Sequence, residues 1–205
     1  MQITELPLIT QNIYESFIPD IDNDVLISEL NTFYANVTAK LNDIYDWDMS
    51  FPAAGPESEK LKEEIIKRVN AVAGKPMICR EIWMYTMSKF MTMPQHNHKT
   101  NYQIHPEEYY SIAYYAKAPS DGANLHFVAQ YCNGMENRIV VPAVTGKLII
   151  FNSFLDHYTD RHLSDEQRMC ISGNYKPETP DKTMVPDWST YIKPKDKNVP
   201  LTRFS

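Results

Sequence analysis

Short segments rich in Tyr, Ile, Val and Phe recur through the middle of the chain, and residues that favour turns separate them. Aromatic and β-branched runs bounded by Pro, Gly, Asn and Asp are typical of strands joined by turns. The predicted strands are 80–87, 90–95, 109–116, 124–131, 138–141, 147–151 and 169–175, with a short one near 157–159. Seven or eight short strands of this kind predict an antiparallel sandwich or barrel.

Two amphipathic helices are predicted ahead of the strands. The first has apolar residues at steps of three and four, and residues 22–24 offer it an N-cap. After a loop over 46–56, the second begins near Ser58 and ends at Gly74-Lys75-Pro76. Helices followed by strands predict an α+β fold that is mainly β, with the N-terminal helices packed on one face of a sheet.

The length of 205 residues predicts a single domain. We expect an N-terminal helical part over 1–75, a β core over 76–176 and an extended tail over 177–205. The tail carries five prolines and therefore cannot form a continuous helix. It could wrap around the domain or contact a partner.

Composition argues against several classes of partner and location. The net charge of -6 disfavours a nucleic-acid partner. No apolar run approaches the roughly 18 residues that span a bilayer, and the N-terminus lacks the basic start and apolar core of a signal peptide. The three cysteines form no C-x-x-C pair, which disfavours a disulfide framework and predicts a reducing, cytoplasmic compartment. Nothing in the sequence indicates an oligomeric state.

Two histidines, His96 and His98, form an H-x-H motif, and His157 stands far downstream. Residues i and i+2 of an extended strand point to the same face. The two imidazoles could therefore bind one metal ion, with a third from a facing strand, and imidazole suits iron, copper, zinc and nickel. The alternative interpretation is that the motif consists of exposed turn residues near Pro94.

The segment that begins at Arg168, eleven residues after His157, has an unusual polar face. With a period of two, that face carries Arg168, Cys170, Ser172 and Asn174. An arginine inside a barrel needs an anionic partner because an unpaired buried charge is very costly. A carboxylate fits the guanidinium fork, and Ser172 could add a hydroxyl. The alternative is that this face is solvated and lies on the outer wall.

The order of these motifs resembles that of the iron(II)- and 2-oxoglutarate-dependent dioxygenases, in particular the small bacterial and phage members near the prolyl-hydroxylase type. The motifs are the H-x-H pair, a Tyr-rich strand over 109–115, Leu125-His126-Phe127, the run P-x-x-x-G-x-L-I-x-F over 142–151, His157 and the segment from Arg168. The resemblance covers about 80–175, under half of the chain. It implies a double-stranded β-helix, or jelly roll, as the core.

Carried across by position, the resemblance implies that iron(II) is bound by His96, His98 and His157. His98 stands where most of the superfamily has Asp or Glu, so the set departs from two histidines and a carboxylate. A carboxylate such as Glu107 or Glu108 is the alternative third ligand. No catalytic residue beyond the metal site is implied.

The resemblance also assigns the cosubstrate 2-oxoglutarate, whose far carboxylate would pair with Arg168 and be assisted by Ser172. Lys147 is a rival for that pairing. The implied reaction uses dioxygen to hydroxylate a peptidyl substrate, such as a prolyl residue, or a small molecule. The alternatives are a non-catalytic metal-binding jelly roll and a cupin-like three-histidine iron enzyme that does not use 2-oxoglutarate. Only the oxygenase needs an inward-facing Arg168.

Overall fold

The computed structural model describes residues 12–38, 54–98, 109–130 and 136–178. The helices are α1 (Asn23–Thr38) and α2 (Pro56–Ala73). The strands are β1 (Ile13–Phe17), β2 (Met77–Met87), β3 (Tyr110–Lys117), β4 (Leu125–Gln130), β5 (Glu136–Val141), β6 (Lys147–Asn152), β7 (Asp156–Thr159) and β8 (Arg168–Pro177).

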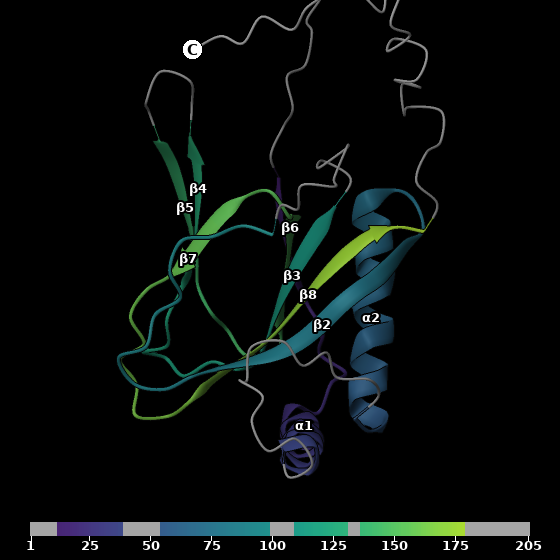
Figure 1. Ribbon diagram of the computed structural model, residues 1–205, viewed down its shortest axis with the longest axis vertical. Helices are drawn as coiled ribbons and strands as arrows, with labels where there is room; N and C mark the ends of the chain where they lie inside the picture. Colours follow the sequence, from purple (N-terminus) through teal and green to yellow (C-terminus); the bar gives the residue numbers. More distant parts are fainter. Residues whose placement is uncertain (1–11, 39–53, 99–108, 131–135, 179–205) are drawn as a thin grey trace, which may run out of the picture.

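Two antiparallel sheets face each other (Figure 1). The larger sheet has the strand order β1-β6-β3-β8-β2 and the smaller one the order β5-β4-β7. The segment 93–98 runs beside β7, where His96 and His157 exchange backbone hydrogen bonds of 3.0 and 2.9 Å. A mainly β fold of antiparallel strands is thereby confirmed, and the strand order is consistent with the predicted jelly roll.

One hydrophobic core lies between the helices and the larger sheet, which confirms that the helices cover one face of that sheet (Figure 1). The side chains buried in it include Leu26, Leu30, Leu61, Ile65, Val69, Ile112, Tyr114, Leu148, Ile150 and Ile171. A second core lies between the two sheets and includes Tyr115, Phe127, Ile149, Phe151 and Cys170. The Phe127 and Phe151 rings meet there edge to face, with centroids 4.9 Å apart. Alternate residues of β3, β6 and β8 thus serve opposite cores.

The helix ends follow the predicted capping chemistry. The Asp22 side chain accepts hydrogen bonds of 3.1 Å from the backbone N–H groups of Asp24 and Val25, which caps α1. Helix α2 ends at Gly74, whose φ of 66° is left-handed and whose N–H donates to the Asn70 carbonyl at 2.9 Å. Helix α1 therefore begins, and α2 begins and ends, close to the positions that the sequence indicated.

Two predictions of secondary structure were wrong. Strand β1 lies in the stretch predicted to be only helical, and it pairs with β6 at the edge of the larger sheet. The segment 90–95 is not a strand. Phe90 has a positive φ of 70° and is 61% exposed, so the chain turns there instead of continuing β2.

Neither of the helices described has the length and apolar character needed to cross a membrane. Of the predicted tail over 177–205, residues 179–205 lie outside the described residues, as do Glu107 and Glu108.

Candidate active site

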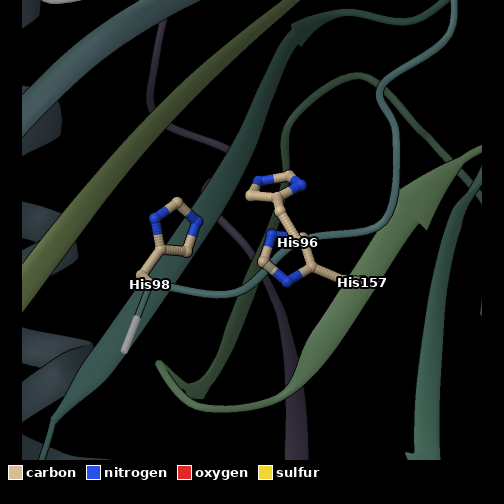
Figure 2. A group of neighbouring side chains, drawn as sticks. All are labelled: His96, His98 and His157. Atoms are coloured by element: carbon tan, nitrogen blue, oxygen red, sulfur yellow. The ribbon is translucent and has the colours of Figure 1, made fainter. Parts of the chain in front are cut away.

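Three imidazoles meet between the two sheets (Figure 2). Their ligand atoms all lie within 4.8 Å of one another, in a group formed by His96, His98 and His157. The ring of His157 lies 4.3 Å from that of His96 and 5.1 Å from that of His98, measured between centroids. His157 is 5% exposed, and the other two are half-buried. The H-x-H side chains therefore approach the remote histidine and are not exposed turn residues.

Backbone carbonyls fix the orientation of two of these rings. His96 Nδ1 lies 2.8 Å from the Pro94 carbonyl, and His157 Nδ1 lies 2.8 Å from the Leu155 carbonyl. A carbonyl oxygen can only accept, so each Nδ1 carries the proton and each Nε2 keeps a free lone pair. Metal-binding histidines in proteins are commonly oriented by such a hydrogen bond on the second nitrogen.

Burial keeps two of the imidazoles neutral. It lowers the pKa of His157 to about 3, with smaller contributions from nearby His96 and His98, and it lowers the pKa of His98 to about 4, with a smaller contribution from His96. A neutral imidazole is the form that binds a metal ion. Both rings are thus ready to act as ligands at neutral pH.

A carboxylate ties the H-x-H segment to β7. Asp156 accepts a hydrogen bond of 2.6 Å from the Asn97 amide and one of 3.2 Å from the Gln95 amide. The two donors alternate with the histidines, so they fix the segment from its opposite face. Sequence reasoning did not identify Gln95 or Asn97, because no local pattern links them to a residue about sixty positions away.

Arg168 lies on the inner face of β8 and is 2% exposed. Its Nη1 lies 2.9 Å from the Met87 sulfur, and its guanidinium carbon lies 4.8 Å from the centroid of the Tyr115 ring. Its buried Nε has no hydrogen-bond partner, and no carboxylate among the described residues pairs with it. A buried guanidinium in this state is costly to the metal-free, ligand-free chain.

The imidazoles and the guanidinium line one cavity, which encloses about 540 Å³ of space that is partly open to solvent. Cys170, Ser172, Trp83 and Tyr85 also line it. The pairing of β2 with β8 sets their order, because Trp83 lies opposite Ser172, Tyr85 opposite Cys170 and Met87 opposite Arg168.

The Trp83 ring lies 5.8 Å from the His98 ring, so the imidazoles sit at the Trp83 end of this row. Arg168 precedes Ser172 by four residues on β8, which is about 13 Å along an extended strand. The cavity therefore presents a histidine end and a cationic end.

Two other candidate residues lie elsewhere. The Lys147 ammonium donates to the Pro142 carbonyl at 3.1 Å and lies 3.6 Å from a Glu15 carboxylate oxygen, so it is already paired and does not line the cavity. His126 stacks on Tyr158 with its Nε2 2.6 Å from an Asp160 oxygen, so it takes no part in the histidine cluster.

The sequence matches no protein-family model and no curated protein. Solved structures resemble the fold. The non-heme alpha ketoglutarate dependent epimerase SnoN from nogalamycin biosynthesis has a TM-score of 0.59 and 12% identity over 82% of this chain and 79% of its own. AviO1 from Streptomyces viridochromogenes Tue57 has a TM-score of 0.57 and 16% identity over 83% and 92%.

HygX from Streptomyces hygroscopicus, solved with nickel and 2-oxoglutarate bound, has a TM-score of 0.53 and 16% identity over 82% of this chain and 83% of its own. At these identities the likeness shows the fold alone.

Proposed function

We propose that this protein is an iron(II)- and 2-oxoglutarate-dependent oxygenase. The observation that carries the proposal is the pairing of two features in one cavity, namely three converging imidazoles and a buried guanidinium that has no anionic partner among the described residues. A metal site alone would not need the guanidinium. A dicarboxylic acid that chelates the metal at one end would satisfy it at the other.

The donor set fits iron(II). His96, His98 and His157 would hold the ion through neutral nitrogens, which suit iron and leave coordination positions for a chelating oxo acid and dioxygen. When bound, iron(II) with 2-oxoglutarate supplies the oxidation: one atom of dioxygen enters succinate, formed with loss of carbon dioxide, and the other enters a substrate C–H bond. His98 in place of a carboxylate leaves the centre one charge unit more positive, which favours an anionic cosubstrate.

The remaining residues of the cavity position the cosubstrate and exclude water. The Arg168 fork would bind the far carboxylate in a bidentate manner, and the Ser172 hydroxyl, on the same face but nearer the imidazoles, would be a further donor to the cosubstrate. Tyr115 and Phe151 are fully buried beside them and close the space between the sheets. The chain thus contributes geometry, while the redox chemistry belongs to the metal and the cosubstrate.

The comparisons support the choice of chemistry. SnoN is described as alpha ketoglutarate dependent and has been solved with Fe3+, alpha ketoglutarate and nogalamycin RO, and HygX with nickel and 2-oxoglutarate. The reaction that we assign to this chain is hydroxylation of a small molecule or of a peptidyl, for example prolyl, substrate.

The test is formation of succinate from 2-oxoglutarate by the purified protein with iron(II) and dioxygen. We expect turnover by the wild type and its loss in the His96→Ala, His157→Ala and Arg168→Ala variants. The matched control is His126→Ala, which removes a histidine outside the cavity and should retain turnover. Equal background in the wild type and all variants would refute the oxygenase. Metal binding without any affinity for 2-oxoglutarate would instead indicate a three-histidine, cupin-like protein.

A further inference from the structure

The inner face of β2 continues past the imidazoles to a carboxylate. Glu81 follows Trp83 at the next inward position and lies opposite Asn174, one step beyond the pair formed by Trp83 and Ser172. The inward-facing residues of β2 and β8 therefore form a row that has the Arg168 guanidinium at one end and the Glu81 carboxylate at the other. The strand rise places Glu81 about 7 Å from Trp83 along β2.

A chain of hydrogen bonds holds this carboxylate in place. The Asn174 amide Nδ2 donates to Glu81 Oε1 at 2.6 Å. Its oxygen lies 2.7 Å from Ser111 Oγ, which in turn lies 2.8 Å from Ser153 Oγ. Because the amide oxygen only accepts, Ser111 donates to Asn174 and Ser153 donates to Ser111. All the donors thus point toward Glu81, which is the arrangement that stabilises an ionised carboxylate.

The same chain connects the carboxylate with the metal-binding end. The carbonyl of Ser153 accepts a hydrogen bond of 2.8 Å from the backbone N–H of His98. Ser111 and Ser153 are 1% and 2% exposed, whereas Glu81 is half-buried. The anchor of the network is therefore inside the fold, and its charged end at Glu81 is only partly buried.

Glu81 has no basic partner among the residues described here. Its neighbour in the row, Trp83, lines the cavity and lies against His98. An indole face is the best aromatic partner for a cation, and a carboxylate next to it adds the charge that an ammonium group needs. A neutral or anionic substrate would leave the negative charge of that carboxylate without a partner.

On the basis of the proposed oxygenase function, we infer that Glu81 and Trp83 form a substrate subsite that binds an aliphatic ammonium group and presents the carbon chain next to it to the metal. The cosubstrate and the substrate are then sorted by charge along the face shared by β2 and β8: the dicarboxylate goes to Arg168 in the cavity and the cation to Glu81, next to the cavity-lining Trp83. Amino sugars and the side chain of a peptidyl lysine both carry such a group.

The test measures binding to protein loaded with nickel(II) and 2-oxoglutarate, which prevents turnover. The probes are butyl-, pentyl- and hexylammonium and the alcohols of the same length, titrated by calorimetry. We expect the ammonium ions to bind about tenfold more tightly than the alcohols. That preference should disappear in Glu81→Gln and persist in Glu63→Gln, which makes the same chemical change at an exposed position on α2.

Equal affinity for ammonium and alcohol in the wild type, or an undiminished preference in Glu81→Gln, would overturn the inference. The affinity for 2-oxoglutarate is measured in every variant and reports separately on the oxygenase proposal, because it depends on the other end of the cavity. Glucosamine and a lysine-containing tripeptide, titrated in the same way, distinguish a small-molecule source of the ammonium group from a peptidyl one.

Discussion

Replacement of Arg168 by Met should change stability and cosubstrate affinity in opposite directions. Methionine keeps most of the side-chain volume and removes the charge. In the ligand-free protein the guanidinium is buried, its Nε has no hydrogen-bond partner within the part of the chain that the structure describes, and its neighbours are a thioether and an aromatic ring. The charge therefore destabilises the folded protein as long as no anion is bound, and only a bound anion offsets that cost.

The magnitudes follow from that environment. Replacing an uncompensated buried charge by an apolar side chain of similar size stabilises proteins by about 1–3 kcal/mol. For a chain of this length, we expect a rise of about 2–12 °C in the melting temperature without ligand. Loss of a buried charge pair to the cosubstrate costs about 2 kcal/mol or more, which corresponds to at least about 30-fold in the dissociation constant of 2-oxoglutarate.

Thermal unfolding of the ligand-free protein and calorimetric titration of 2-oxoglutarate onto the nickel(II)-loaded protein measure the two effects. Arg138→Met is the matched control, because Arg138 is exposed and pairs with Glu136 at 2.7 Å on the edge strand β5. It should change either quantity very little. A less stable Arg168→Met variant with unaltered affinity for 2-oxoglutarate would refute this reasoning.

Three further predictions concern the metal site and the fold. Because burial lowers the pKa of His157 to about 3 and that of His98 to about 4, the unfolded chain takes up protons below pH 6.5 that the folded chain does not. The free energy of unfolding of the metal-free protein should therefore fall by about 2 kcal/mol between pH 7 and 5.5, and a flat profile in urea denaturation would contradict this. Asp156→Asn should weaken nickel(II) binding about tenfold in competition with a chelator, and unchanged affinity would show that the Gln95 and Asn97 contacts do not orient the site. Gly146→Ala should destabilise the protein by about 1 kcal/mol, because its φ of 82° is left-handed while an added Cβ meets no atom within 4 Å; equal melting temperatures would count against it.

Local patterns were sufficient to predict which of several key side chains share a face, but not whether that face points into the fold. Alternation along β8 placed Arg168 and Ser172 on one face, and both line the cavity. The spacing of His96 and His98 likewise placed two imidazoles on one side of an extended segment, where they meet His157. These inferences succeeded because a period of two determines which residues of an extended segment share a face, whatever its partners are.

The pairing of strands that lie far apart in the sequence could not be predicted from local patterns. Strand β1 is short, its sequence Ile-Tyr-Glu-Ser-Phe shows no regular alternation of apolar and polar residues, and its partner β6 lies more than a hundred positions away. The register that sets Met87 beside Arg168, and Glu81 beside Asn174, arises only when β2 pairs with β8. The strand predicted over 90–95 failed because the apolar side chain of Phe90 indicates a strand while its backbone turns.

Anaerobic titration of the iron(II)-loaded protein with 2-oxoglutarate tests most directly whether the histidine cluster and Arg168 hold a metal and its dicarboxylate together. Chelation of iron(II) by the oxo acid gives a visible charge-transfer absorption. We expect this absorption to saturate at one 2-oxoglutarate per chain in the wild type, to be absent in His157→Ala and to require far more 2-oxoglutarate in Arg168→Met. No absorption in the wild type, or the same titration curve in all three proteins, would contradict the account.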